Sequence, residues 1–393
     1  MKPRSDHVEH RTPVRVAIVS SVHRWNDTRI YVKQAQSLRD AGFQVTLVAV
    51  SAKGETRAFQ AEGVIVHPLP RRRPLMRWLN WLAILRVLIR TRPALIHGHD
   101  PELFPLISLA RIAGCRVVCD VHEDVAEQIS HKEWIPRPLR RPLSALARFG
   151  QRSLPHLVDA VILAEDSYRR NFPPSQNIFV VRNFPLVPSV FKTDYVSTNL
   201  KLVYVGDVRI VRGVETYVRV THSLVASGVP ATLRVVGSFA IRDEEEHIRQ
   251  LIGRLGLNER VQLMGRQPPA ALPSLICDCD VGLALLYPIG NYRESYPTKM
   301  FEYMGCGLPV VASDFELWAN VLVPNDCGRV VDPLDVQRIT EILSEYWRAP
   351  DVRRRQGTNG RRAVVDQYNW NVDLPTLLGV YEAITGAAMT VPQ

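Results

Sequence analysis

A lysine and two glutamates lie close together in the segment NYRESYPTKMFEYMGCGLPVVASD, residues 291–314. Pro297 fits the first position of a helix, where a missing N–H costs nothing, and Thr298 and Lys299 continue the first turn. The free N–H groups and the positive dipole end of such a turn can hold a phosphate group. Lys299 adds a positive charge at the same end, so the segment predicts an anion site.

Two carboxylates flank this predicted anion site. Glu302 lies three residues after Lys299 and shares a helix face with it, while Glu294 precedes the helix. A carboxylate cannot bind a phosphate, but it accepts hydrogen bonds from neighbouring sugar hydroxyls. A nucleotide sugar would use all of these groups at once. The alternative interpretation is a solvated helix face whose charges pair with one another.

Alternating strands and helices are needed to position these residues. Short β-rich runs occur at residues 14–20, 44–50, 64–68, 94–99, 116–121 and 160–164. The alternation restarts with runs at residues 200–206, 232–237, 260–265, 280–286, 308–314 and 328–332. Strand–helix alternation of this length indicates parallel sheets covered on both faces. We therefore expect an α/β protein with two doubly wound, Rossmann-like domains facing a central cleft, and ligands at the carboxyl ends of the strands.

A proline-rich break separates the two halves. Residues 183–199 contain two prolines, Pro185 and Pro188, and no helical period, which is typical of a linker. We predict an N-terminal domain at residues 1–185, a linker at 186–199 and a C-terminal domain at 200–369. A final helix at about residues 370–393 carries an apolar period, and the sequence leaves open whether it packs back on the first domain.

The composition is that of a globular protein. Of 393 residues, 46% are hydrophobic and 22% are charged, and the net charge of +10 favours an anionic partner such as a nucleotide, a nucleic acid or an acidic membrane. Residues 1–13 have no apolar core, so we expect no cleavable signal peptide. The apolar run at residues 75–89 is too short to span a bilayer and is interrupted by arginines. Six cysteines without a paired CxxC predict small buried thiols in a reducing cytoplasm, where we expect the protein to reside.

Five fragments, spread in order along residues 14–370, resemble the glycosyltransferase family 4 enzymes, which have a GT-B fold. ESYPTKMFE followed by YMGCGLPVVASD is similar to the Glu-x7-Glu signature of that family. The other fragments are HRWNDTRI, HGHDPELFPL, CDVHED and YVGDVRIVRGVE. The resemblance implies a retaining transfer of a sugar from a nucleotide diphosphate donor, usually without a metal. It therefore implies no cofactor beyond the nucleotide sugar substrate.

The resemblance also implies roles for the residues of the second half. Glu294 would hydrogen-bond the donor sugar and Glu302 the ribose, while Pro297, Thr298 and Lys299 would bracket the diphosphate.

A second set of residues in this half concerns the departing phosphate. Arg212 stands where the family usually has a lysine that neutralises this group, and its guanidinium suits the task. Gly206 ends the strand, but Asp207 occupies a position where the family often has a second cation. Arg209, or Arg29 from the first domain, is a possible replacement for that cation.

In the first half, His99 ends the run ALIHGH, and the resemblance implies that it contacts the donor sugar near the reacting carbon. His97 is its rival, two residues earlier on the same face of the strand. His122 and Glu123, after CDV, are candidates for the acceptor side.

The candidate residues of the HRWNDTRI fragment complete the acceptor side. They are Asp27, which can also cap a helix, and Arg29.

Two basic, apolar stretches in the first half predict contact with an anionic membrane. Residues 71–93 mix arginines with tryptophans and leucines at helical spacing, and residues 137–152 add a second stretch. We therefore expect a glycan or a lipid-linked acceptor and peripheral association with the inner face of a membrane. The alternative is a pair of core helices with solvated arginine faces.

Other interpretations are weaker. Asp278 and Asp280 spell a DxD metal motif, but they precede a strand, so we expect no metal there. The sequence has no GxGxxG after the first strand, no P-loop and no nucleic-acid-binding motif. Base selection is expected to depend on backbone contacts around residues 265–268. A nucleotide-sugar epimerase or hydrolase of the same fold and a non-catalytic binding module remain alternative functions.

Overall fold

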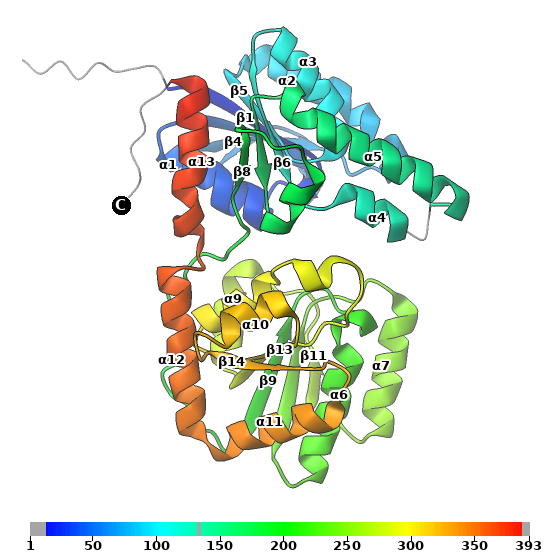
Figure 1. Cartoon of the computed structure of the whole chain (residues 1–393), viewed down its shortest axis with the longest axis vertical. Coiled ribbons are helices and arrows are strands. Elements are labelled where there is room, and N and C mark those ends of the chain that lie inside the picture. Colours follow the sequence, from blue (N-terminus) through cyan, green and yellow to red (C-terminus); the bar gives the residue numbers. More distant parts are fainter. Residues whose placement is uncertain (1–12, 132–134, 387–393) are drawn as a thin grey trace, which may run out of the picture. The chain divides into compact units, whose positions relative to one another are not determined.

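The computed structural model describes residues 13–131 and 135–386 and divides the chain into two compact units (Figure 1). The first unit comprises Met1–Asn183 and Asp373–Gln393, and the second comprises Phe184–Val372. The chain therefore passes from one unit to the other twice. Residues 1–12, on which the signal-peptide expectation rests, lie outside the described residues.

The first unit is built on an eight-stranded sheet in the order β3-β4-β2-β1-β5-β6-β7-β8. Its strands are β1 (Arg15–Arg24), β2 (Gln44–Val50), β3 (Phe59–Ala61), β4 (Val64–Leu69), β5 (Leu95–Gly98), β6 (Arg116–Val121), β7 (Ala160–Leu163) and β8 (Ile178–Val180). All neighbouring pairs are parallel except β3 with β4. Strands such as β2 and β5 are almost entirely buried, as expected for a sheet covered on both faces.

The helices of the first unit connect these strands. They are η1 (Thr28–Ala35), α1 (Gln36–Asp40), η2 (Pro74–Asn80), α2 (Trp81–Thr91), η3 (Pro101–Leu103), α3 (Phe104–Ile112), α4 (Val125–His131), α5 (Arg137–Leu157) and η4 (Asp166–Asn171). The Asp27 side chain accepts hydrogen bonds from the N–H groups of Arg29 and Ile30 and so caps η1, as the sequence predicts. Unlike the ordinary helix expected there, η1 is a π-helix.

The second unit is built on a six-stranded parallel sheet in the order β11-β10-β9-β12-β13-β14. Its strands are β9 (Leu200–Val205), β10 (Ala231–Val236), β11 (Val261–Leu263), β12 (Val281–Ala284), β13 (Val310–Ser313) and β14 (Gly328–Val331). Its helices are η5 (Ile210–Arg212), α6 (Val214–Ala226), α7 (Arg242–Arg254), η6 (Pro269–Ala271), α8 (Leu272–Cys277), η7 (Gly290–Glu294), α9 (Thr298–Gly305), α10 (Glu316–Leu322), α11 (Val336–Arg348) and α12 (Pro350–Asp366). The fold class expected from the sequence, α/β with two Rossmann-like domains, is confirmed.

Each sheet has a point at which the strand order reverses. In the first unit, β1 lies between β2 and β5, and in the second unit, β9 lies between β10 and β12. Ligands of open α/β sheets bind outside the carboxyl ends of the strands at such points. The loops after β1, β5, β9 and β12 are therefore the places to look for chemistry in each unit.

The segment expected as a linker packs on the second unit. Phe184 and Tyr195 are buried there, and the Tyr195 hydroxyl donates a hydrogen bond of 2.7 Å to the carbonyl of Gly307. This hydrogen bond of Tyr195 holds the non-helical segment against the second unit. The proline content of the segment alone does not predict this contact.

The last described helix, α13 (Trp370–Thr385), begins in the second unit and continues in the first. Its Tyr381 hydroxyl lies 2.7 Å from Nδ1 of His97, within the first unit. In the part of the chain that the structure describes, no helix has both the length and the apolar character needed to cross a bilayer.

Candidate functional site

The candidate residues of the second unit surround the start of α9, close to the end of β9. Gly206 directly follows β9 with a φ of 133°, a backbone conformation that favours glycine. A Cβ atom at this position would lie 3.3 Å from Cε of Lys299. The glycine therefore leaves room for the lysine side chain beside the strand end.

Lys299 is a buried cation in the first turn of α9. Pro297 is the N-cap rather than the first helical residue, so the helix begins one residue later than the sequence predicts. The Nζ atom lies 5.2 Å from the centroid of the Tyr204 ring, and the residue is 9% exposed. Burial, followed by the charge of Arg212, lowers the pKa of Lys299 to about 8, while Glu302 and Asp207 oppose this shift.

Arg212 provides a second cation near Lys299. It ends η5, and its Nε donates a hydrogen bond of 3.4 Å to the Tyr292 hydroxyl. Its Nη1 lies 3.9 Å from a carboxylate oxygen of Asp207. We call Arg212 and Lys299 the cation pair, because the charge of Arg212 acts on Lys299 and lowers its pKa.

The structure brings the remaining predicted donor-side residues to the same end of the sheet. Thr298 is the first residue of α9, Glu302 lies one turn further along it, and Glu294 ends η7. The first N–H groups of α9 have no partner within an α-helix, so this end can accept an anion. The role of each residue stays a prediction.

The two arginines expected to replace the missing second cation are engaged elsewhere. Nε of Arg209 lies 3.0 Å from a carboxylate oxygen of Glu244, which also accepts the N–H of Ile210. Arg29 is 3% exposed and lies in the first unit, where its Nη2 is 3.0 Å from Asp120. The Arg29 guanidinium is thus buried against a carboxylate of its own unit, and its predicted roles, as a diphosphate-binding charge or in acceptor binding, stay predictions.

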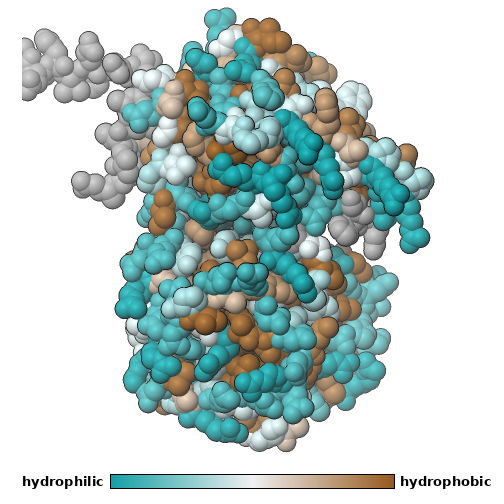
Figure 2. Space-filling model, viewed as in Figure 1, coloured by the Kyte–Doolittle hydropathy of each residue, from teal (hydrophilic) through white to brown (hydrophobic). Residues whose placement is uncertain are grey.

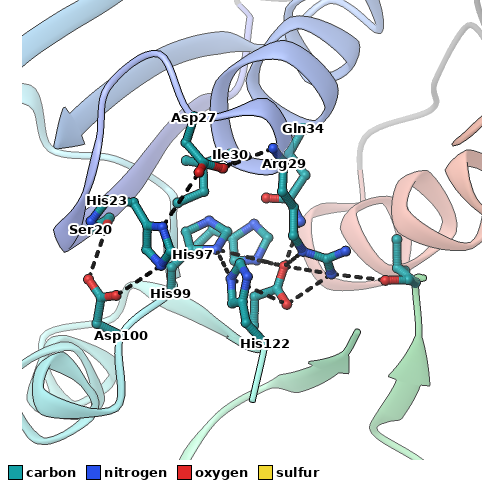
Figure 3. A network of polar contacts seen from close by, with 12 residues as sticks. Ser20, His23, Asp27, Arg29, Ile30, Gln34, His97, His99, Asp100 and His122 are labelled. Atoms are coloured by element: carbon teal, nitrogen blue, oxygen red, sulfur yellow. Dashed lines mark hydrogen bonds and ion pairs between the residues drawn. The ribbon is translucent and has the colours of Figure 1, made fainter. Parts of the chain in front are cut away.

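A buried polar network occupies the carboxyl ends of β1, β5 and β6 in the first unit (Figure 3). Asp120 is its centre, with no exposed surface. Arg29 donates to both carboxylate oxygens of Asp120 and also to the carbonyl of Val181. Gln34, also from η1, donates a further hydrogen bond to Asp120. The charge of Asp120 is thus compensated inside the unit.

Three histidines surround Asp120, and we call these four residues the histidine–aspartate cluster. One nitrogen each of His97, His99 and His122 lies 3.7 Å from an oxygen of Asp120. Nδ1 of His99 and Nε2 of His122 are 2.7 Å apart, so one of the two rings donates a hydrogen bond to the other (Figure 3). The Nε2 atom of His99 has no hydrogen-bond partner among the described residues.

The electrostatics of this cluster keep the histidines neutral. Burial lowers the pKa of His97 and of His122 to about 4, and it lowers the pKa of His99 well below its ordinary value. Burial alone would raise the pKa of Asp120, but Arg29 and the three histidines lower it below its ordinary range. A neutral imidazole beside a charged Asp120 and Arg29 is therefore the stable arrangement at neutral pH.

A pocket of about 250 Å³ opens beside the cluster, and three of the predicted site residues, His99, His122 and Glu123, line it. His23 and Asp100 also line it, and the sequence analysis missed both. Burial lowers the pKa of His23, but the hydrogen bond to Asp27 and the charge of Asp100 outweigh it, so the pKa is raised. His23 lies at the carboxyl end of β1 and Asp100 lies two residues after β5, and these positions at the ends of the strands were the available signal.

The donor set of the cluster also has the composition of a metal site. One ligand atom each of His97, His99 and Asp120 lies within 4.8 Å of the others. A cation there would compete with Arg29 for both oxygens of Asp120 and would be repelled by the guanidinium. The residues therefore do not fit a metal well, and the expectation of a metal-free protein stays a prediction.

Both aspartates of the DxD motif form ion pairs with lysine or arginine side chains. Asp280 is buried, accepts the N–H of Lys201 and lies 3.3 Å from Nζ of Lys192. Asp278 pairs with Lys201 and Arg234. Both carboxylates therefore have cationic partners within the second unit.

Comparison with known protein families gives two matches. The family model described as Glycosyl transferases group 1 matches residues 190–363. The model described as Glycosyl transferase 4-like domain matches residues 29–183. The two matches correspond closely to the second and the first unit.

Curated relatives and solved structures resemble the chain. It is 30% identical over 134 residues to an MMP alpha-(1->4)-mannosyltransferase of Mycolicibacterium hassiacum, covering 34% of this chain and 31% of that protein. It is 30% identical over 150 residues to a phosphatidyl-myo-inositol mannosyltransferase of Mycobacterium leprae, covering 38% of each. The chain thus matches about a third of the length of these relatives. Sucrose-phosphate synthase from Thermosynechococcus elongatus shares the fold with a TM-score of 0.76 at 17% identity, covering 96% of this chain and 100% of that chain.

Proposed function

We propose, from the premise that the chain belongs to glycosyltransferase family 4 with the GT-B fold, that it transfers a sugar from a nucleotide diphosphate sugar to a glycan or lipid-linked acceptor. The proposal places it in the synthesis of a polysaccharide or glycolipid, in the cytoplasm. The phosphatidyl-myo-inositol mannosyltransferases among its relatives support this class by their names.

One observation carries the proposal: the cation pair at the start of α9, beside the point where the strand order of the second sheet reverses. Nζ of Lys299 lies over an aromatic ring in a site where burial weakens its hold on a proton. Arg212 stands beside it with a positive charge at every accessible pH. Such a site gains stability when an anion with two or more charges binds.

The charges explain how this unit would promote transfer. Breaking the bond between the anomeric carbon and the phosphate leaves negative charge on the diphosphate and positive charge on the sugar. Lys299, Arg212 and the N–H groups of α9 would stabilise the leaving diphosphate. We propose that the acceptor attacks from the face that the diphosphate leaves, which retains the anomeric configuration, without a metal ion.

The remaining residues take positioning roles in this proposal. Glu294 would hold the hydroxyls of the donor sugar, and Glu302 those of the ribose. His99, whose Nε2 lacks a hydrogen-bond partner among the described residues, would contact the donor sugar near the reacting carbon. The pocket lined by His122 and Glu123 would receive the acceptor hydroxyl.

A thermal-shift screen with nucleoside diphosphates and their sugars tests the proposal. A ligand that binds only the folded state at 100 times its Kd stabilises it by about 2.7 kcal/mol. We expect a selective shift for one nucleoside diphosphate, lost in Lys299→Ala and kept in Arg219→Ala, whose side chain pairs with Glu215 on the surface of α6. Shifts no larger than those given by inorganic diphosphate would contradict a nucleotide site.

Release of the nucleoside diphosphate separates the alternatives. A transferase releases it from the nucleotide sugar only when an acceptor is present. A hydrolase releases it without an acceptor, and a non-catalytic module binds the donor without any release.

Membrane association is the second part of the proposal, and it rests on an apolar face of the first unit. Leu82, Leu85 and Ile89 follow one side of α2 and are exposed, whereas the buried residues of this helix lie on the other side. The residues before α2 add Leu75, which is 82% exposed, and Trp78, which is 61% exposed. Figure 2 shows apolar side chains gathered over the region of α2 and α3.

The helix α5 continues this character with a stripe of exposed apolar residues at helical spacing. The stripe consists of Leu139, Leu143, Leu146 and Phe149. Exposed arginines such as Arg141 and Arg148 lie on the same helix. Exposed leucines and aromatics beside arginines are typical of a surface that binds anionic lipid headgroups.

Vesicle flotation tests this part without using the enzymatic activity. We expect recovery with phosphatidylglycerol vesicles, little recovery with phosphatidylcholine vesicles, and several-fold weaker recovery for the double variant Leu75→Ser, Trp78→Ser. The control is Leu334→Ser, an exposed leucine of the second unit. Equal recovery from both vesicle types, insensitive to salt, would contradict the electrostatic proposal.

A further inference from the structure

Two cysteines meet where two helices of the second unit end. Cys277 is the last residue of α8, and Cys306 is the C-cap of α9. Sγ of Cys277 lies 3.8 Å from the carbonyl oxygen of Cys306. Sγ of Cys306 lies 3.9 Å from the carbonyl oxygen of Pro273, one helical turn before Cys277. Each thiol therefore reaches the backbone of the other helix, and each thiol influences the titration of the other.

The two thiols differ in access. Cys306 is 1% exposed and belongs to the hydrophobic core around α9. Cys277 is partly exposed and lines a pocket of about 340 Å³ together with Lys192 and Asp280. The expectation of six buried thiols is therefore wrong for Cys277 and for Cys115, which is also partly exposed. A small reagent can reach Cys277 but not Cys306.

Positive charges near Cys277 favour its thiolate. The hydrogen bond from Cys306 lowers the pKa of Cys277, burial opposes this, and the charges of Lys192 and Arg361 add to the lowering. The Arg361 guanidinium is held nearby, because its Nη1 donates a 2.6 Å hydrogen bond to the carbonyl of Gly305. The same hydrogen bond and burial raise the pKa of Cys306. One thiol is thus the better nucleophile and the other remains protonated beside it.

We infer that Cys277 and Cys306 form an oxidation site, in which Cys277 reacts with a peroxide and Cys306 then closes a disulfide between the ends of α8 and α9. The assignment is independent of the proposed sugar transfer.

The chemistry of this site balances with hydrogen peroxide as the oxidant. The Cys277 thiolate attacks one peroxide oxygen, the O–O bond breaks, and Cys277 becomes a sulfenic acid while the departing hydroxide takes a proton to form water. The Cys306 sulfur then attacks the sulfenic sulfur. An S–S bond forms, the S–O bond breaks, and hydroxide leaves with the Cys306 proton as a second water molecule. The two thiols lose two electrons, and the peroxide gains them.

Peptide mapping of the peroxide-treated full chain tests the inference. We expect the loss of two of the six thiols, a mass decrease of two hydrogen atoms, and one cross-linked peptide pair containing Cys277 and Cys306, all reversed by a thiol reductant. In the untreated protein, iodoacetamide should alkylate Cys277 about tenfold or more faster than Cys115, because burial raises the pKa of Cys115 and the chain gives it no thiol partner in the described residues.

Matched variants sharpen this test. Cys277→Ser should abolish the cross-link, whereas Cys115→Ser should leave it unchanged. Cys306→Ser should leave Cys277 as a sulfenic acid that dimedone traps, and if this core variant does not fold, the mapping of the unmodified chain still decides. The inference is overturned if peroxide yields no Cys277–Cys306 peptide, or if Cys115 and Cys277 are alkylated at the same rate.

Discussion

The polar centres of the two units treat charge in opposite ways. In the first unit, Asp120 accepts hydrogen bonds from Arg29 and Gln34 and is surrounded by neutral histidines. The negative charge of Asp120 is therefore balanced by Arg29 within the protein. In the second unit, Lys299 and Arg212 are like charges whose neighbouring carboxylates offset them only in part. A compensated centre holds its own geometry, whereas an uncompensated one is stabilised by a ligand. Substitutions in the polar centre of the first unit are therefore expected to lower stability. Substitutions in the polar centre of the second unit are expected to lower ligand binding and turnover.

Among the substitutions, the largest effect is expected for Asp120→Ala, which breaks the compensated centre. Removing this carboxylate leaves the Arg29 guanidinium buried without its partner, which costs about 3–5 kcal/mol. Urea denaturation at pH 7 measures the loss in the free energy of unfolding. Asp278→Ala is the control, because its ion pairs with Lys201 and Arg234 lie at the surface and are worth about 0–1 kcal/mol. Equal stability of the two variants would contradict the comparison.

The next effect concerns the cation pair. Lys299→Ala and Arg212→Ala should each lower turnover by about 10² or more, the scale expected when one group that stabilises developing charge is lost. Arg209→Ala should change turnover much less, because Glu244 engages that arginine. Initial rates with the nucleotide sugar found in the thermal-shift screen measure this. Unchanged turnover in both single variants would remove the proposed mechanism.

A separate effect on stability is expected when the pH falls. His97 and His122 have pKa values of about 4 in the folded protein and near 6.5 when unfolded, and His99 is shifted in the same direction. Between pH 6.5 and 4 the unfolded chain therefore binds more protons, and each histidine removes up to about 1.4 kcal/mol of stability per pH unit.

His23 opposes this acid loss, since its pKa is raised on folding. Denaturation midpoints at pH 7, 6 and 5 measure the balance. Stability that is flat or rising over this range would show that the histidines are not held neutral.

The smallest effect is a pH dependence of nucleotide binding. The pKa of Lys299 is about 8 without ligand, so raising the pH above 8 removes its charge from the site. We expect the affinity for the nucleoside diphosphate to fall by at most about tenfold per pH unit, while the unliganded fold gains stability from pH 8 towards 10.5. Isothermal titration calorimetry of the wild type and Lys299→Arg measures this. The arginine variant should lose this dependence, and its persistence there would assign it to another group.

The local structure around the cation pair in the second unit was easier to predict than the histidine–aspartate cluster of the first unit, because its sequence signals are local. The run from Pro297 to Lys299, the glycines around it and the strand before Gly206 each indicate their structure within a few residues. The pairing of Arg29 with Asp120 joins positions that are 91 residues apart, and no local pattern indicates it. Gln34 was missed for the same reason, because its hydrogen bond to Asp120 joins positions that are 86 residues apart. The π-helical form of η1 also has no local signal in its residues.

The return of α13 to the first unit limits how this protein can be dissected. The hydroxyl of Tyr381 meets His97 from a segment almost three hundred residues away, and Asp373 accepts the backbone N–H of Arg182. A fragment that stops at residue 183 would lack both contacts, whereas one that fuses residues 373–386 after residue 183 through a short spacer would restore them. Expression of isolated halves should therefore be planned around the discontinuous unit rather than around a single cut.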